Sequence, residues 1–204
     1  MRRYAASIAV VLSCLASPAF ATLVWNESLS GDLSNDRLSP TVLAFTAGQN
    51  DVIGTTGDVG GSVDRDYFSF TIGSGLTLVG MTLLDNTSVA GSGSFLAIQA
   101  GPQVTTTETG GNIGALLTFG HYDTGLIGAN LIDQWLGLAA LPAGTYSIWV
   151  QETGGTVDYG LRFDVATAPV PLPAGLPLLL TGLSGIWALT RRYSPRARTP
   201  SRLP

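Results

Sequence analysis

Three short segments alternate large apolar residues with small or polar ones, and this alternation constrains the fold more than any other feature. Apolar side chains recur at every second position, which places them on one face of a β-strand rather than on a helix. Each segment therefore predicts a strand with one buried face. The predicted buried residues are Phe68, Phe70 and Ile72; Tyr146, Ile148 and Val150; and Tyr159, Leu161, Phe163 and Val165.

Further short apolar runs lie at residues 42–46, 76–84, 95–99 and 116–119, and glycine-rich segments separate them. Many short strands with turns at this spacing predict an all-β fold, an antiparallel β-sandwich of jelly-roll type. Residues 104–112 are rich in threonine and glycine and predict an exposed loop. Residues 126–138 have room for a short helical turn.

The first residues have the features of a secretory signal peptide. Arg2 and Arg3 precede an uncharged apolar stretch, and Ala19 and Ala21 supply the small residues of a cleavage site. We therefore expect residues 1–21 to be removed. The only cysteine, Cys14, lies in this segment, so the mature chain is expected to form no disulfide.

A second apolar segment, residues 172–190, carries no charge. A helix of this length reaches about 28 Å, close to the thickness of the hydrocarbon core of a bilayer. Arginines follow the segment, and basic residues at the end of a membrane helix stay on the cytoplasmic side. We expect a transmembrane helix at 172–190, with the preceding domain, residues 22–166, on the outer side.

The residues on both sides of this helix resemble a bacterial sorting signal. The motif and its basic pair are Val170, Pro171, Leu172, Pro173, Ala174, Arg191 and Arg192. This arrangement resembles the PEP-CTERM signals, in the variant whose motif reads VPLPA. The resemblance implies that residues 167–204 are a sorting signal, processed by an exosortase-type membrane enzyme at the inner membrane. The tail after Arg192 is longer than is typical of the family, which leaves a permanent membrane anchor as the alternative.

The charges are distributed unevenly along the chain. All 14 acidic residues lie between Glu27 and Asp164, whereas only Arg37, Arg65 and Arg162 of the ten basic residues lie there. Such a negative domain repels nucleic acid, so no nucleic-acid partner is expected. The charge suits either the binding of divalent metal ions or solubility outside the cell.

The region between the two signals resembles the bacterial pre-peptidase C-terminal domain. The segments that carry the resemblance are residues 26–34, the acidic pair and aromatic strand at 64–70, and the strands at 141–150 and 159–163. The resemblance implies a non-catalytic β-sandwich, in a family some of whose members bind calcium or collagen.

Two groups of carboxylates are candidates for a metal site. Asp58, Asp64 and Asp66 lie around a Gly-Gly turn, and Asp64 and Asp66 project to one side of an extended segment. Calcium takes six to eight oxygen ligands, so calcium is the candidate cofactor and these aspartates are the candidate ligands. The second group is Glu27, Asp32 and Asp36. The capping of turns by aspartate is the alternative role.

The sequence predicts no catalytic residues. His121 is the only histidine, and residues 22–168 contain no Gly-x-Ser-x-Gly motif. Three tryptophans, Trp25, Trp135 and Trp149, are candidates for stacking on a sugar ring. For Trp149, burial beneath a loop is the favoured alternative.

Together these features predict a non-enzymatic exported protein of the cell surface or extracellular matrix. By resemblance, its sorting signal links it to exopolysaccharide or biofilm, so exopolysaccharide is a candidate partner. Two alternatives stay open at this point: a calcium- or carbohydrate-binding module, and a secreted hydrolase.

Overall fold

The computed structural model describes residues 21–90 and 94–168. The predicted membrane helix, the sorting motif and the signal peptide up to residue 20 lie outside these residues. Within the described ranges, no helix is both long enough and apolar enough to cross a membrane.

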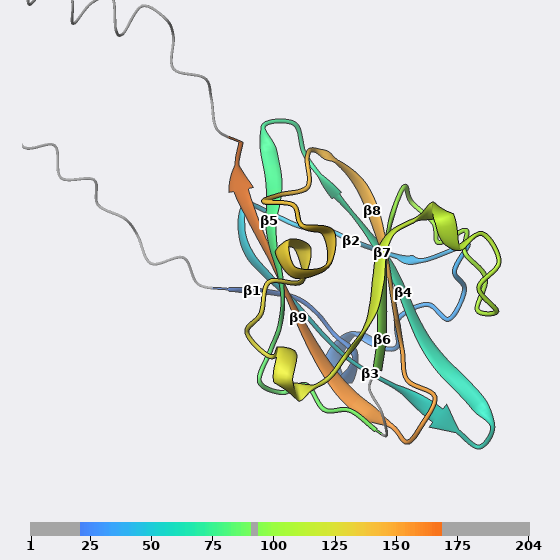
Figure 1. The fold of residues 1–204 in the computed structure, drawn as a ribbon. Coiled ribbons are helices and arrows are strands. Elements are labelled where there is room, and N and C mark those ends of the chain that lie inside the picture. Colours follow the sequence, from blue (N-terminus) through green and yellow to red (C-terminus); the bar gives the residue numbers. More distant parts are fainter. Residues whose placement is uncertain (1–20, 91–93, 169–204) are drawn as a thin grey trace, which may run out of the picture. The chain divides into compact units, whose positions relative to one another are not determined.

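The described residues form an all-β unit, as the alternation of apolar residues predicts (Figure 1). Its strands are β1 (Thr22–Asn26), β2 (Thr41–Leu43), β3 (Gly48–Val59), β4 (Ser62–Ile72), β5 (Leu76–Leu83), β6 (Ser94–Ala100), β7 (Leu116–Tyr122), β8 (Gly144–Gln151) and β9 (Val157–Thr167). The helical segments are α1 (Glu27–Ser30), η1 (Ile113–Ala115), η2 (Thr124–Leu126) and η3 (Ile132–Leu136). The turn expected at 126–138 thus corresponds to η3 and the end of η2.

The strands form one curled sheet in the order β5-β9-β3-β4-β8-β6-β7, in which neighbouring strands are antiparallel. The sheet also contains two parallel pairs, because β1 adds to β3 and β2 adds to β4. Strands β3 and β4 pair only near their shared turn, between Gly57 and Asp64. Away from that turn they diverge, and the two halves of the sheet face each other across the core.

The core confirms the predicted buried faces. Phe163 of β9 packs on Phe70 of β4 with ring centroids 5.2 Å apart, and it meets Phe68 edge-on at 6.0 Å. These contacts join the two halves of the sheet. Every residue that the alternation assigns to a buried face belongs to this core: Phe68, Phe70, Ile72, Tyr146, Ile148, Val150, Tyr159, Leu161, Phe163 and Val165.

Strand β3 has no apolar alternation, so the sequence pattern does not predict it. Its buried positions 50, 52, 54 and 56 hold Asn50, Val52, Gly54 and Thr56. Asn50 is fully buried, and its side-chain amide forms hydrogen bonds with the backbone of Thr46. Nδ2 donates to the Thr46 carbonyl at 2.9 Å, and Oδ1 accepts from the Thr46 N–H at 2.9 Å. Polar residues can therefore face this core where their hydrogen bonds are satisfied.

The segment predicted as an exposed loop at 104–112 is partly buried. Val104 and Thr106 are buried, and Val104 packs with Trp149, Tyr67 and Ala97 on the outer face of the sheet. The Val104 N–H donates to the Arg37 carbonyl at 2.9 Å, which holds the segment in place. Trp149 is only 4% exposed, so its burial beneath a loop is confirmed.

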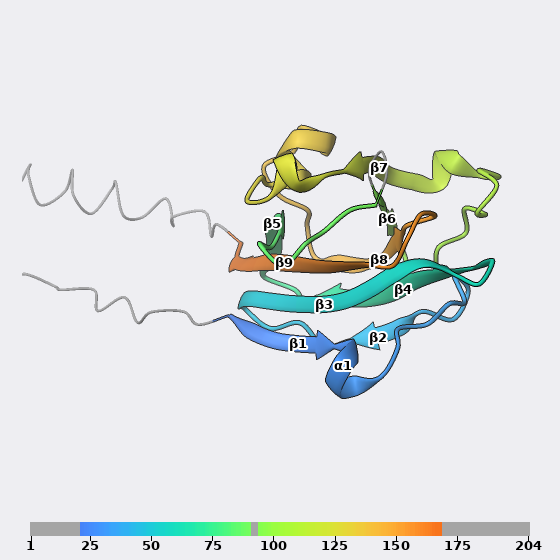
Figure 2. The same cartoon turned by 90° about the horizontal axis from the view of Figure 1, so that it is seen from below.

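The arrangement of the strands separates two sides of the unit. Figure 2 shows β1 and α1 along one side, with β7 and η3 on the opposite side. The start of β1 and the end of β9 emerge at the same end of the unit (Figure 1).

A glycine on β3 is required by the packing of Tyr159. A Cβ atom at Gly54 would lie 2.6 Å from the Tyr159 hydroxyl oxygen, and the Tyr159 side chain is fully buried. We predict that Gly54→Ala lowers the free energy of unfolding by about 1–3 kcal/mol, because the ring cannot move without strain. Urea denaturation measures the change. The control is Gly114→Ala, where a Cβ atom meets nothing within 4 Å; equal losses in both variants would contradict this packing.

Candidate metal site

Helix α1 positions the first carboxylate of the site. Asn26 caps the helix, since its Oδ1 accepts from the Ser28 N–H at 3.0 Å. Glu27 is the first helical residue, and its carboxylate spans two segments: Oε1 accepts from the Leu33 N–H at 3.1 Å, and Oε2 accepts from the Thr55 N–H at 2.7 Å. Glu27 therefore ties the loop after α1 to strand β3.

The loop after α1 brings in the second carboxylate. Leu33 is buried in the main core, and it anchors the loop next to the sheet. The preceding residue, Asp32, is exposed and reaches the site from the solvent side. Its pKa is raised, first by partial burial and second by the negative charge of Asp64.

Strand β4 supplies the third carboxylate. Asp66 lies two residues before Phe68, so the pleat of the strand turns both side chains toward the interior. Asp66 is 0% exposed, and neither of its carboxylate oxygens has a hydrogen-bond partner. One carboxylate oxygen from each of Glu27, Asp32 and Asp66 lies within 4.8 Å of the others. This group is hereafter called the acidic site.

The electrostatics of the acidic site are unfavourable for three negative charges. Burial raises the pKa of Asp66 to about 9, and the nearby charge of Glu27 adds to the shift. Burial also raises the pKa of Glu27, against the lowering effect of its two backbone hydrogen bonds. Among residues 21–90 and 94–168, no arginine forms a salt bridge with these carboxylates: Arg162 pairs with Asp51, Arg37 with Glu108, and Arg65 donates to Gln151.

The interior side of the acidic site is lined by a tyrosine. Tyr159 of β9 is fully buried, and its hydroxyl has no hydrogen-bond partner among the described residues. Burial, followed by the negative charge of Asp66, raises the pKa of Tyr159 well above its ordinary value. The hydroxyl is therefore protonated near Asp66, and it is a neutral polar neighbour for that carboxylate.

The structure separates the residues that the sequence proposed as one metal group. Asp66 is in the acidic site, and Asp64 lies near it with its Oδ1 accepting from Asn35 Nδ2 at 3.0 Å. Asp58 lies elsewhere: it is exposed at the β3–β4 turn, and its Oδ1 accepts from the Gly61 N–H at 2.7 Å. Asp58 thus has the alternative role of a turn cap.

The second proposed group is also divided. Glu27 and Asp32 join Asp66, whereas Asp36 caps its own turn by accepting from the Leu38 N–H at 2.9 Å. Spacing along the chain groups neighbouring acids only, so it does not predict the combination of Glu27 and Asp32 with Asp66 of β4. The signal that could have found it is the spacing of Asp66 from Phe68, which places a carboxylate on an apolar face.

The acidic site fits a hard divalent cation by its chemistry. All three donors are carboxylates, the ligand type that calcium prefers, and the exposed Asp32 leaves a side of the site open to water. Glu27, Asp32 and Asp66 would hold the ion, with carbonyl groups or water completing its shell. The ion would supply positive charge to a group of acids that has no salt-bridge partner among the described residues.

In comparisons with known proteins, no family model and no curated protein matches this chain.

The metal-free protein should lose stability as the pH rises. Asp66 keeps its proton in the folded state up to a pKa of about 9, whereas it loses it near 3.8 when unfolded. The folded state therefore binds more protons than the unfolded state between these values, and stability falls with increasing pH. We predict a loss on the order of 1–4 kcal/mol between about pH 5 and pH 8 in EDTA.

The matched variant is Asp66→Asn, which cannot titrate. We measure its free energy of unfolding by urea denaturation in EDTA at both ends of the same pH range. The change with pH should be at most half of the change in the unaltered chain. Equal slopes would show that Asp66 ionises normally in the folded state.

Proposed function

We propose that this chain is an exported calcium-binding domain of the cell surface or extracellular matrix, without enzymatic activity. The observation that carries this proposal is the Asp66 carboxylate, which is 0% exposed, lacks a hydrogen bond and lies within reach of Glu27 and Asp32. A buried carboxylate without a partner costs several kcal/mol. A cation coordinated by its oxygens offsets that cost.

Protonation alone satisfies Asp66 less well than a metal ion does. A protonated carboxyl group loses its charge, but it still carries one donor and acceptor lone pairs that need partners. The Glu27 carboxylate and the Tyr159 hydroxyl lie near enough to affect the Asp66 pKa, but neither forms a hydrogen bond of normal geometry with its oxygens. A bound divalent ion coordinates the oxygens of Asp66 and offsets two of the three negative charges that Glu27, Asp32 and Asp66 carry when ionised.

Calcium bound at this site would join separate parts of the chain. Glu27 and Asp32 come from α1 and the loop that follows it, and Asp66 comes from β4. The ion would hold the N-terminal segment against the sheet and so stabilise the domain. A site with three carboxylates and one open side fits the weaker range typical of extracellular modules, with dissociation constants of about 10⁻⁴–10⁻³ M.

Two signals in the sequence support export and sorting. An N-terminal signal peptide would deliver the domain across the inner membrane, and the motif at residues 170–174 resembles the PEP-CTERM sorting signals. On this proposal an exosortase-type enzyme processes the tail, and the domain reaches the cell surface, where exopolysaccharide is a candidate partner. In this proposal the domain is a jelly-roll-like sandwich, and it serves as a component of the extracellular matrix.

We predict that calcium raises the melting temperature of the full-length chain, purified in detergent after treatment with EDTA. Isothermal titration should show binding in the range given above, and Asp66→Asn should weaken it at least tenfold because the ion loses a charged ligand. Asp32→Asn should weaken binding to a smaller extent, since Asp32 is exposed and water can replace it.

The matched control is Asp85→Asn. Asp85 is also an aspartate, but it is exposed and lies outside the acidic site. This variant should bind calcium like the unaltered chain. Absence of heat and of any shift in melting temperature, or equal weakening by the Asp85 and Asp66 variants, would refute calcium binding at this site.

The sorting proposal predicts the mass of the mature protein in its native host. Cleavage after Ala21 and processing near residues 170–174 would give a product that begins at Thr22 and lacks Arg202. Intact mass spectrometry of the protein isolated from the envelope or the medium measures this directly. A product that retains Arg202 would instead indicate a permanent anchor.

A further inference from the structure

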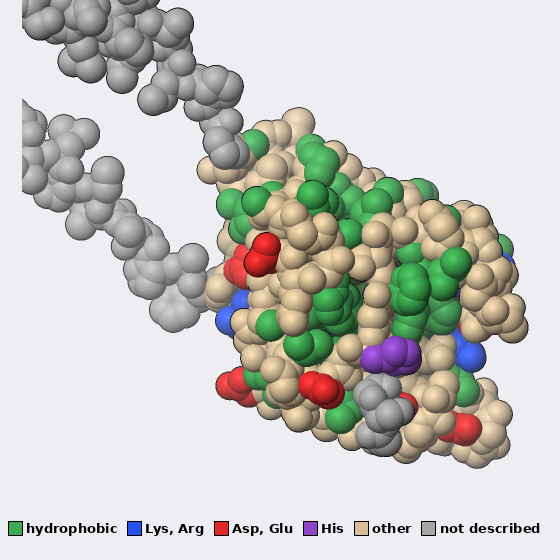
Figure 3. Space-filling model, viewed as in Figure 1, with side chains coloured by type: hydrophobic (Ala, Val, Ile, Leu, Met, Phe, Trp, Pro, Cys, Tyr) green, Lys and Arg blue, Asp and Glu red, His purple; other side chains and the backbone are tan. Residues whose placement is uncertain are grey.

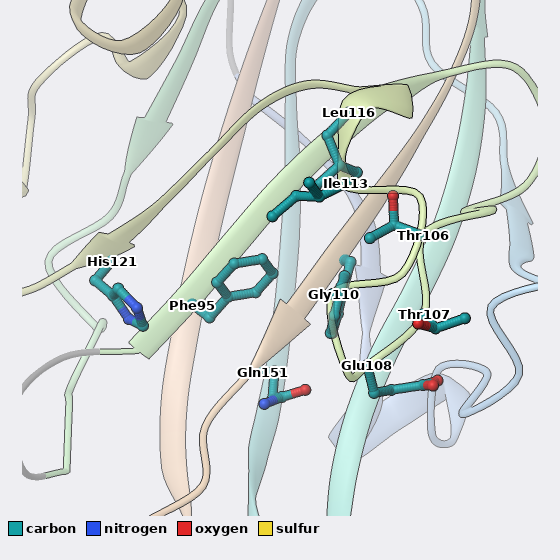
Figure 4. A pocket seen from close by; sticks show the side chains of 10 residues that line it. Phe95, Thr106, Thr107, Glu108, Gly110, Ile113, Leu116, His121 and Gln151 are labelled. Carbon is teal, nitrogen blue, oxygen red and sulfur yellow. The ribbon is translucent and has the colours of Figure 1, made fainter.

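A small pocket lies on the outer face of the sheet, away from the acidic site. Strands β6 and β8 form its floor, and the segment from Thr106 to Leu116 forms its wall (Figure 4). Its volume is about 160 Å³. In Figure 3 hydrophobic side chains gather on this face beside His121, the only histidine of the chain.

The pairing of three strands aligns the residues at the centre of the pocket. Phe95 of β6 lies directly opposite Gln151 of β8 on one side and His121 of β7 on the other. Opposite residues in adjacent strands project from the same face of a sheet. Gln151, Phe95 and His121 therefore form a row across the sheet, with Phe95 at the centre and the two polar side chains on either side of it.

Aromatic rings contact one another at the floor of the pocket. Phe95 and Trp149 meet edge to face with centroids 4.6 Å apart, and Phe95 and His121 meet edge to face at 5.9 Å. Phe95 is only partly buried, whereas Trp149 is held beneath the covering segment. An apolar ring face thus remains available at the floor of the pocket.

Planar polar side chains surround this apolar floor. Gln151 Oε1 accepts from Arg65 Nε at 2.7 Å, which orients the amide and leaves its Nε2 without an acceptor among the described residues. Glu108 Oε1 accepts from the Tyr67 hydroxyl at 3.2 Å and lies 3.9 Å from Arg37 Nε, whereas Glu108 Oε2 has no partner among the described residues and is free to accept. The buried Nε1–H of Trp149 has no acceptor in the described parts of the chain either.

We propose that this pocket binds one sugar ring of a neutral or amino polysaccharide. A pyranose ring has an apolar C–H face that packs on an aromatic ring, and a rim of hydroxyl groups that both donate and accept hydrogen bonds. The floor of Phe95 and the rim of Gln151, Glu108 and His121 match these two parts.

The size of the pocket and the charge of the domain restrict the class of ligand that the pocket can bind. Pockets for drug-sized ligands measure about 300–1,000 Å³, so this smaller pocket takes a single ring of a longer chain. A purely apolar ligand would give no hydrogen bond to Gln151 Nε2 or to Glu108 Oε2, neither of which has a partner among the described residues, and a cationic side chain offers no acceptor to Gln151 Nε2. The excess of acidic residues in the domain repels uronic acids and sulfated sugars.

The pocket is separate from the acidic site. The pocket and the acidic site share no residue, and β7, which carries His121, lies on the side of the unit opposite α1, which carries Glu27 (Figure 2). Sugar binding should therefore persist when the calcium ligands are removed, and failure of one proposal leaves the other intact.

The test is titration of the full-length chain, in a detergent without a sugar headgroup, with hexamers of glucose, N-acetylglucosamine, glucosamine and mannuronate. We expect a neutral or amino hexamer to bind, with similar affinity in EDTA and in calcium. Phe95→Ala should weaken binding at least about tenfold, because it removes the apolar floor. The exposed His121 allows a second variant, His121→Ala, which should also weaken binding without unfolding the chain.

The matched control is Leu117→Ala, since Leu117 is exposed on β7 but does not line the pocket. It should bind like the unaltered chain. Urea denaturation confirms that each variant is folded. Three results would overturn the proposal: no binding of any neutral or amino hexamer, a preference for the mannuronate hexamer, or binding that the Phe95 and His121 variants leave unchanged.

Discussion

The burial of the Asp66 carboxylate without a hydrogen bond is the constraint on which the proposed function depends. The pleat of β4 places this side chain in line with Phe68 and Phe70, at the end of the core. A charged group in this position requires compensation by a proton or by a cation. Glu27 and Asp32 are two further acids next to Asp66. A proton on Asp66 leaves their negative charges unopposed, whereas a cation compensates charge on all three carboxylates.

Strand β4 serves both proposed sites through two consecutive residues. Asp66 points to the interior and joins the acidic site, whereas Tyr67 points to the outer face and packs on Trp149, with ring centroids 5.7 Å apart. The Tyr67 hydroxyl donates to Glu108, which fixes the segment that forms the wall of the sugar pocket. Alternation along one strand thus separates a polar interior site from an aromatic exterior one.

The sequence predicted the strands in which apolar residues recur at every second position. Strands β4, β8 and β9 carry their buried residues at alternate positions, so their faces could be assigned in advance. Strand β3 could not, because Asn50 and Thr56 at its buried positions are polar, and the need for Gly54 comes from Tyr159, which lies far along the chain. For the same reason, sequence spacing identified Asp66 as a candidate ligand but joined it to Asp58, which caps a turn, instead of to Glu27 and Asp32. Likewise, Phe95 was recognised only as part of a strand, since its neighbours Gln151 and His121 come from two other strands.

The most direct test of the central claim is a crystal structure of the protein grown in calcium, with an anomalous difference map. We expect a peak about 2.3–2.6 Å from a carboxylate oxygen of each of Glu27, Asp32 and Asp66. A map without a peak at this position, with Asp66 hydrogen-bonded to water or to the Tyr159 hydroxyl instead, would contradict it.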